Sequence, residues 1–346
     1  MSLPGRIARS NFFVKLVNWE YWPFGIVQAP FFIYCVWLSL KARSFLFFTA
    51  SNPSILSGGM LGESKSEVLK LVPDDVKPKT VLINCKATTE EVLAILKRNG
   101  ISLPVIFKPD LGERGWMVRR IKSVEDITQY LREIKIDFIA QELVDLPLEF
   151  GVFYVRFPSE SLGVVNSITG KEFLSVTGNG KKSLQELILD KDRARLQWET
   201  LRVTYADRLE EVIPAGKVVE LVSIGNHCLG TKFINCNHLI TPQLNKSFNR
   251  ISKQIDGFYF GRFDLRCASE KDLQEGRVKI VELNGCGAEP AHIYHPGASL
   301  WAALKVLAKH WSNLYRISVE NHRRGVPYLS LREGREIYRN FKALKN

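Results

Sequence analysis

Cysteine is scarce in this sequence and is nowhere concentrated. Six cysteines stand at positions 35, 85, 228, 236, 267 and 286 of the 346 residues, and no two of them form a C-x-x-C pair. The pattern excludes a disulfide framework of the kind that holds small secreted domains together, and it is typical of reduced thiols in a cytosolic compartment.

The middle of the chain lacks an excess of charge. Of the formal net charge of +12, residues 1–50 carry +4 and residues 300–346 carry +7, which leaves +1 for the rest. A nucleic-acid enzyme usually carries its basic excess where the ligand lies, so we expect no nucleic-acid partner. An anionic membrane surface explains basic ends at least as well.

A long, uninterrupted apolar run is also missing. The most apolar stretch, residues 22–40, contains two prolines, and as a helix it would be about 28 Å long, barely a bilayer core. We expect Pro30 to break or kink a helix there. No small-residue cleavage site follows, so the stretch is not a cleavable signal. We favour a monotopic membrane-surface anchor or re-entrant hairpin over a full span, with a buried core helix or a dimer contact as the alternative.

Neither an internal repeat nor a P-loop is present. The segment Gly178-Asn179-Gly180-Lys181 lacks the leading glycine of a P-loop, because position 175 is serine. Apolar patterns instead alternate between strands and helices, which predicts an α/β or α+β fold with a mixed sheet. We expect strands at 44–49, 80–84, 103–109, 116–120, 138–144, 149–157, 218–223, 258–265 and 278–281, a polar turn at 270–277, a loop at 167–171, and helices at 63–72, 88–98, 123–134, 184–209, 299–314 and 335–344.

Polar residues with oxygen atoms gather at two of these strands. If strands 258–265 and 278–281 pair in antiparallel fashion, Asp264, Glu282 and Asn284 come together on one sheet face, since residues two apart share a face. Two carboxylates and an amide oxygen suit Mg²⁺, which keeps its other positions for water and phosphate oxygens. The alternative is a polar strand end at the protein surface.

A lysine and a glycine-rich loop follow another strand. Lys108 lies near the end of strand 103–109, and the loop Gly112-Glu113-Arg114-Gly115 comes next. Such a loop folds over phosphates with its backbone N–H groups, and lysine supplies a point charge. A plain glycine hairpin is the alternative.

The ordered set of motifs resembles the ATP-grasp superfamily over residues 45–310. The nucleotide and metal residues resemble D-alanine–D-alanine ligase, whereas segments 178–188 and 214–225 resemble the cyanophycin synthetase branch. The resemblance implies two α+β subdomains that sandwich ATP, and a ligase that forms carbon–nitrogen bonds through an acyl phosphate. It implies domains at 44–104 (short N-terminal α/β), 105–190 (lid) and 191–314 (metal-binding), after a membrane-associating segment at 1–43 and before a basic tail at 315–346.

The resemblance also implies roles for single residues. Lys65 and Lys108 would bind nucleotide phosphates, the loop from Gly112 to Gly115 would form the lid, and Arg262 would steady the acyl phosphate or the substrate carboxylate. Glu282 would lie between two Mg²⁺ ions, with Asp264 and Asn284 as further ligands. The remaining nucleotide residues are Gln141, Glu142, Leu143 and Val144 as the adenine hinge, Glu149 for the ribose hydroxyls, and Lys171 either as a lid lysine or as part of a solvated loop.

The acceptor region departs from the family. Residues 289–295 replace the small-residue loop of D-alanine ligases, so substrate identity does not carry over. Within this segment Glu289, His292 and His295 line an acceptor pocket or, as the alternative, bind a metal.

The resemblance implies an ATP- and Mg²⁺-dependent carboxylate–amine ligase. We expect amino-acid-like or lipid-linked substrates and a cytoplasmic protein that is peripheral or monotopic at the inner face of the membrane. A homodimer is one option for its oligomeric state. The alternatives are an ATP-grasp kinase that does not ligate, and a membrane-associated ATP-binding scaffold that has lost catalysis.

Overall fold

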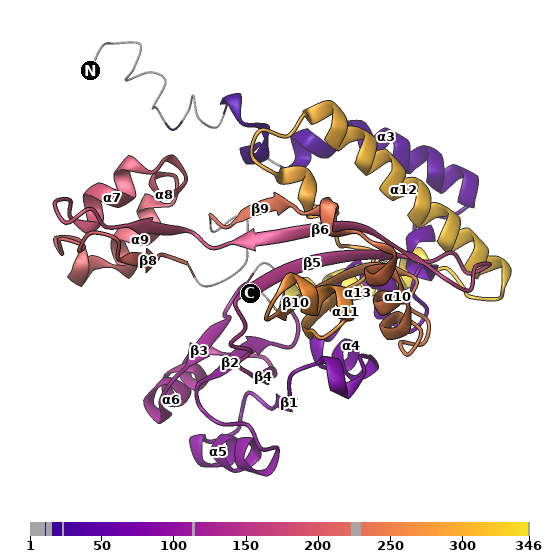
Figure 1. The fold of residues 1–346 in the computed structure, drawn as a ribbon. Coiled ribbons are helices and arrows are strands. Elements are labelled where there is room, and N and C mark those ends of the chain that lie inside the picture. The colour runs from indigo at the N-terminus through magenta and orange to yellow at the C-terminus, as the bar shows by residue number, and fades with distance from the viewer. Residues whose placement is uncertain (1–10, 12–15, 23, 113–114, 223–229, 345–346) are drawn as a thin grey trace. The chain divides into compact units, whose positions relative to one another are not determined.

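The structure is a computed structural model that describes the chain except residues 1–10, 12–15, 23, 113–114, 223–229 and 345–346 (Figure 1). The fold is mixed α/β with antiparallel sheets, which confirms the predicted class. The chain divides into two compact units. Unit 1 comprises Met1–Pro30, Gly170–Asn235 and Ala291–Ala303, and unit 2 comprises Phe31–Thr169, Cys236–Pro290 and Leu304–Asn346.

A four-stranded antiparallel sheet forms one part of unit 2. Its strand order is β1 (Thr80–Ile83), β4 (Phe138–Glu142), β2 (Val105–Pro109) and β3 (Arg119–Ile121). Helices α5 (Thr89–Arg98) and α6 (Val124–Glu133) share its apolar core, in which the rings of Phe107, Tyr130 and Phe138 meet. Capping boxes begin both helices, because the Thr88 and Ser123 side chains accept the N–H groups that the first turn leaves unpaired.

A second, five-stranded sheet has the order β11 (Lys279–Asn284), β10 (Phe260–Cys267), β5 (Leu148–Val155), β6 (Val164–Glu172) and β9 (Lys232–Asn235). Helices α4 (Lys65–Leu71), α10 (Pro242–Ser252) and α11 (Glu270–Glu275) contribute to the apolar core on one side of this sheet. On the opposite face, Phe153 and Phe260 pack with Leu314 and Ile317 of α12 (Leu300–Arg323).

Two expectations for this region are wrong. Residues 167–171 lie in strand β6 rather than in a loop, because their backbone hydrogen-bonds to neighbouring strands and Ser167 and Thr169 are buried. The polar segment 270–277 contains helix α11, which Ser269 caps and Gly276 ends in a left-handed conformation.

The N-terminal apolar region also differs from expectation. Residues 44–49 form a turn and the 3-10 helix η2 (Phe47–Ala50) instead of a strand, because Phe47 packs into the core against Tyr315 and Thr49 accepts the Leu329 N–H. Helix α3 (Phe24–Ala42) continues through Pro30, since the loss of one donor is outweighed by a helix of 19 residues whose inner side packs on α12. Within the described residues, no helix has both the length and the apolar character needed to cross a membrane.

Unit 1 contains a small sheet and short helices. Strands β7 (Ser175–Thr177) and β8 (Val218–Glu220) pair in antiparallel fashion. The helical region expected at 184–209 is broken at Lys191, whose backbone is extended. There the chain turns so that Arg193 forms a buried ion pair of 2.6 Å with Glu20. The resulting elements are α7 (Leu184–Asp190), α8 (Asp192–Arg195), α9 (Trp198–Thr204) and η5 (Ala206–Arg208).

The remaining elements are short or terminal. They are η1 (Trp19–Tyr21), η3 (Leu56–Gly58), η4 (Asp74–Val76), η7 (Asn237–Leu239), η8 (Ala291–Tyr294) and α13 (Leu331–Ala343).

Asn52 joins the loop before η3 to strand β10. Its side chain is 0% exposed. Its Nδ2 donates to the carbonyls of Gly58 (2.9 Å) and Phe260 (2.8 Å), and its Oδ1 accepts from the N–H groups of Tyr259 (2.9 Å) and Phe260 (3.0 Å). The Gly58 carbonyl also accepts from Cys286 N, two residues after Asn284. One amide therefore connects three segments around the end of β11.

We expect Asn52→Ala to lower the free energy of unfolding by about 3 kcal/mol, because several buried backbone groups lose their partner together. Urea denaturation checks this value. The matched control is Asn99→Ala, where an exposed amide donates only to Ile95 O; there we expect a change of roughly 0.5 kcal/mol. Equal effects at the two positions would contradict a joining role for Asn52.

Candidate active site

Strands β10 and β11 bring the predicted metal ligands together. The strands are antiparallel, Asp264 lies directly opposite Glu282, and Arg262 lies opposite Asn284. Asp264 is buried, and Asn284 Nδ2 donates to Asp264 Oδ2 at 3.2 Å. This bond uses the amide nitrogen, so the Asn284 oxygen is the atom suited to a cation.

Arg262 holds Asp264 in place. Its guanidinium donates to both carboxylate oxygens, from Nε to Oδ1 (2.8 Å) and from Nη2 to Oδ2 (3.1 Å). Its Nη1 donates to the Glu289 carbonyl at 3.1 Å. The neighbouring strand carries Gly151 opposite Asp264, and a Cβ there would lie 3.0 Å from Arg262 Cδ and 3.1 Å from Asp264 Oδ1. A glycine therefore leaves room for the ion pair on this face.

Lys108, in strand β2 of the four-stranded sheet, contacts strand β11 of the five-stranded sheet. Its Nζ donates to the carbonyl of Val281 (3.0 Å), the residue before Glu282, and to Gln141 Oε1 (3.1 Å). Gln141 Nε2 donates to the same Val281 carbonyl at 3.2 Å and to Thr80 Oγ1 at 3.1 Å. Strands β2, β4 and β11 of unit 2 thus meet at one lysine, one glutamine and one carbonyl.

Burial lowers the pKa of Lys108 to about 8, although the charge of Glu282 acts in the opposite direction. The side chain is 7% exposed. At neutral pH the ammonium is therefore largely charged, and it becomes neutral as the pH rises through about 8.

If Lys108 binds phosphate oxygens of ATP, as the resemblance implies, this titration predicts how the Kd for ATP depends on pH. A neutral lysine cannot pair with phosphate, so we expect the Kd for ATP to rise above pH 8, by up to about tenfold per pH unit. Isothermal titration between pH 7 and pH 9.5 measures it. The Lys108→Arg variant keeps its charge over this range and is expected to show no such rise. A flat profile for the unaltered protein would contradict the assignment.

The predicted adenine hinge follows strand β4. Gln141 is buried, and its side chain contacts Lys108, the Val281 carbonyl and Thr80. The Glu142 N–H donates to Lys79 O at 2.8 Å. The Val144 carbonyl accepts from Arg266 Nη1 at 3.3 Å. Leu143 lies between these two residues, just after the end of β4.

Arg266 is a site residue that the sequence analysis missed. It lies opposite Glu149, forms an ion pair with it (Nη2 to Oε2, 2.9 Å), and also contacts the carbonyls of Val144 and Leu146. It therefore joins the predicted ribose carboxylate to the predicted hinge. The signal was available, because Arg262, Asp264 and Arg266 share one face of β10.

Lys65 lies beside the glycine-rich loop. Its Nζ donates to the Gly112 carbonyl at 2.5 Å, and its backbone N–H donates to Asp110 O at 3.0 Å. Asp110, a second residue that was missed, is buried and accepts the Ser66 N–H at 2.7 Å, which fixes the start of α4. Gly112 and Gly115 both have positive φ angles, 149° and 76°, whereas residues 113–114 of the loop lie outside the described residues.

Three other predicted residues lie in unit 1. They are Lys171 at the end of β6, His292 in η8, and His295, whose Nδ1 accepts the Asn235 N–H at 3.3 Å. Glu289 belongs to unit 2, where its carbonyl accepts from Arg262. In the described part of the chain, no group of three His, Cys, Asp or Glu side chains is arranged to hold a metal ion. The candidate cation site instead depends on the Asn284 oxygen as its third ligand.

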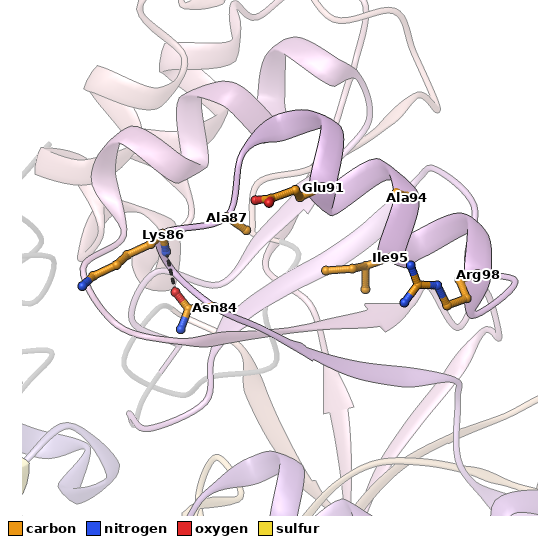
Figure 2. A pocket seen from close by; sticks show the side chains of 7 residues that line it. All are labelled: Asn84, Lys86, Ala87, Glu91, Ala94, Ile95 and Arg98. Carbon is orange, nitrogen blue, oxygen red and sulfur yellow. Dashed lines mark hydrogen bonds between the residues drawn. The ribbon is translucent and has the colours of Figure 1, made fainter.

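A separate open hollow of about 460 Å³ lies beside α5 and shares no residue with this site. Figure 2 shows its lining, including the Lys86 N–H that donates to Asn84 Oδ1 at 2.9 Å. The residues that line it are Asn84, Lys86, Ala87, Glu91, Ala94, Ile95 and Arg98.

No protein-family model matches the chain, and no curated protein matches it. Among solved structures it is similar to D-alanine–D-alanine ligase from Bacillus anthracis (12% identity, TM-score 0.43, covering 82% of this chain and 72% of that one). It is also similar to a D-Ala:D-Ser ligase from Enterococcus faecalis (14%, 0.42, 79% and 64%).

A third similar structure is a bifunctional glutathione synthetase from Pasteurella multocida (14% identity, TM-score 0.37, covering 70% of this chain). The chain spans 35% of the length of that enzyme.

Proposed function

We propose that this protein is an ATP- and Mg²⁺-dependent carboxylate–amine ligase of the ATP-grasp type. The observation that carries the proposal is the contact of the Lys108 ammonium with the Val281 carbonyl, beside Glu282. A cation for phosphate and a set of metal-binding oxygens are thereby held next to each other. Phosphoryl transfer needs this combination, because both groups offset charge on the triphosphate.

The oxygen set fits magnesium. Asp264 and Glu282 face each other across the strand pair, and Asn284 adds an amide oxygen. The bidentate contact with Arg262 uses two of the roughly four lone-pair positions of the Asp264 carboxylate, which leaves capacity for a cation. Bound magnesium would offset charge on the transferred phosphoryl group.

The protein groups would then act as follows. Lys108 and Lys65 bind phosphate oxygens, and the glycine-rich loop from Gly112 covers them. A substrate carboxylate oxygen attacks the γ-phosphorus and the bond to ADP breaks, which gives an acyl phosphate. Arg262 pairs with the negative charge of this acyl phosphate. An amine then attacks the acyl carbon, loses a proton to water, and displaces inorganic phosphate.

We place the reaction at the cytoplasmic membrane surface, with amino-acid-like or lipid-linked substrates. The apolar N-terminal region and the basic ends of the chain support this location.

Hydroxylamine trapping tests the proposal. The purified protein with Mg²⁺-ATP, hydroxylamine and a panel of amino acids and fatty acids is expected to form a hydroxamate and release ADP and phosphate in equal amounts. A phosphorylated product without free phosphate would favour the kinase alternative. ATP binding without ADP release for every carboxylate tested would overturn the ligase.

A further inference from the structure

The outer side of α3 carries a continuous apolar surface in unit 2. At about 100° per residue, the exposed side chains cover an arc of about 140° around the helix. Ile33 is 78% exposed and Leu40 is 65% exposed. The surface, which we call the α3 face, consists of Phe32, Ile33, Val36, Trp37 and Leu40, and Phe45 is exposed just beyond the helix.

The opposite side of the helix is already occupied. Phe31 and Leu38 are buried, and the Tyr34 hydroxyl lies 3.5 Å from Ser312 Oγ on α12. Figure 1 shows α12 running alongside α3. The α3 face therefore remains after the helix has packed, and it is not needed to hold the helix in place.

Charge along α3 and the neighbouring part of α12 has one sign. Between Glu20 and Glu63 the sequence contains no carboxylate, and its only charged residues are Lys41 and Arg43, both exposed. The adjacent helix α12 has no carboxylate before Glu320, and it exposes Lys305, Lys309 and Arg316. Such a surface suits a partner that is apolar inside and anionic at its edge.

An aromatic and a basic side chain stand together at the end of the face. Lys41 Nζ lies 4.4 Å from the centre of the Trp37 ring and 5.3 Å from that of Tyr315. Tryptophan and lysine are the residue types that anchor proteins at the level of lipid headgroups. One side of α3 is packed and the other is exposed and apolar, which suits a helix that lies in the plane of the membrane interface.

We propose that the α3 face docks on a bilayer containing anionic lipid, with α3 parallel to the membrane and with Lys41 and Arg43 among the headgroups. The proposal deepens the membrane location given above and rests on that part of the proposed function, not on ligase chemistry.

Vesicle flotation with the full chain, purified without detergent, tests this surface. Vesicles of phosphatidylcholine mixed with phosphatidylglycerol are expected to bind the protein at least about tenfold more tightly than phosphatidylcholine alone. The double variant Ile33→Glu, Leu40→Glu should lose at least about 10²-fold in binding, because charges replace the inserted side chains. The control is Leu162→Glu, at an exposed apolar residue elsewhere in unit 2, and this variant should bind as the unaltered protein does.

A second variant separates charge from insertion. Lys41→Gln with Arg43→Gln should remove the preference for anionic vesicles. Unchanged flotation of the Ile33→Glu, Leu40→Glu variant would overturn the proposal. A second outcome would also overturn it: the unaltered protein does not bind vesicles and is a dimer by light scattering without lipid, and the Ile33→Glu, Leu40→Glu variant is a monomer. ATP binding by the same variants, measured without vesicles, should be unaltered, so a failed flotation result is distinguishable from a failed ligase.

Discussion

Lys108→Met is expected to reduce ATP turnover by at least about 10²-fold, because the substitution removes the cation that we propose pairs with phosphate oxygens in the transition state. The ammonium lies within hydrogen-bonding distance of the Val281 carbonyl, where strand β2 contacts strand β11. Methionine has a similar length and volume, so the neighbouring side chains need not move. Steady-state ADP release measures the loss.

Stability separates this effect from misfolding. A buried ammonium costs free energy, so the melting temperature of Lys108→Met should be unchanged or higher. The matched control is Lys70→Met, where an exposed lysine pairs with Glu67 on the surface, and its turnover should equal that of the unaltered protein. If the turnover of Lys108→Met is within tenfold of that of the unaltered protein, Lys108 is not an active-site residue.

Glu282→Gln is expected to lower Mg²⁺-dependent turnover by at least about 10²-fold and to raise the Mg²⁺ concentration that gives half-maximal activity. The substitution keeps the shape of the side chain and removes its charge, and Glu282 faces Asp264 across the strand pair. A magnesium titration of ADP release measures both effects.

The Glu282→Gln substitution should also lower the pKa of Lys108. The charge of Glu282 raises the Lys108 pKa and so opposes the effect of burial. When this charge is removed, the Kd for ATP should begin to rise at a pH below 8. The control is Glu270→Gln, which changes an exposed carboxylate in the first turn of α11. Neither its magnesium dependence nor the pH at which its Kd for ATP rises should differ from those of the unaltered protein. Normal magnesium dependence in Glu282→Gln would show that the residue is not a metal ligand.

Local patterns predicted several elements well. Helices α5 and α6 were predicted close to their observed bounds, since their caps Thr88 and Ser123 act on residues only three positions away. Strands β10 and β11 were predicted as an antiparallel pair, and the structure confirms this pairing.

Elements that depend on distant partners were not predicted. Strand β6 is polar in sequence and is a strand because of the strands beside it. Helix α10 went unassigned, although Thr241 and Pro242 mark its start. Residues 44–49 have the composition of a strand but find no strand to pair with. Three of the four hydrogen bonds of Asn52 reach residues more than 200 positions away, so no local pattern reports them.

The sequence by itself determined that Asp264, Glu282 and Asn284 share a face, because side chains alternate along paired strands whatever surrounds them. Only the tertiary structure decided that Lys108 meets the carbonyl of Val281, 173 positions along the chain, and that Arg266 holds Glu149. The lowered pKa of Lys108 belongs to the same category, since burial is a property of the packed molecule and not of the residues next to it in sequence.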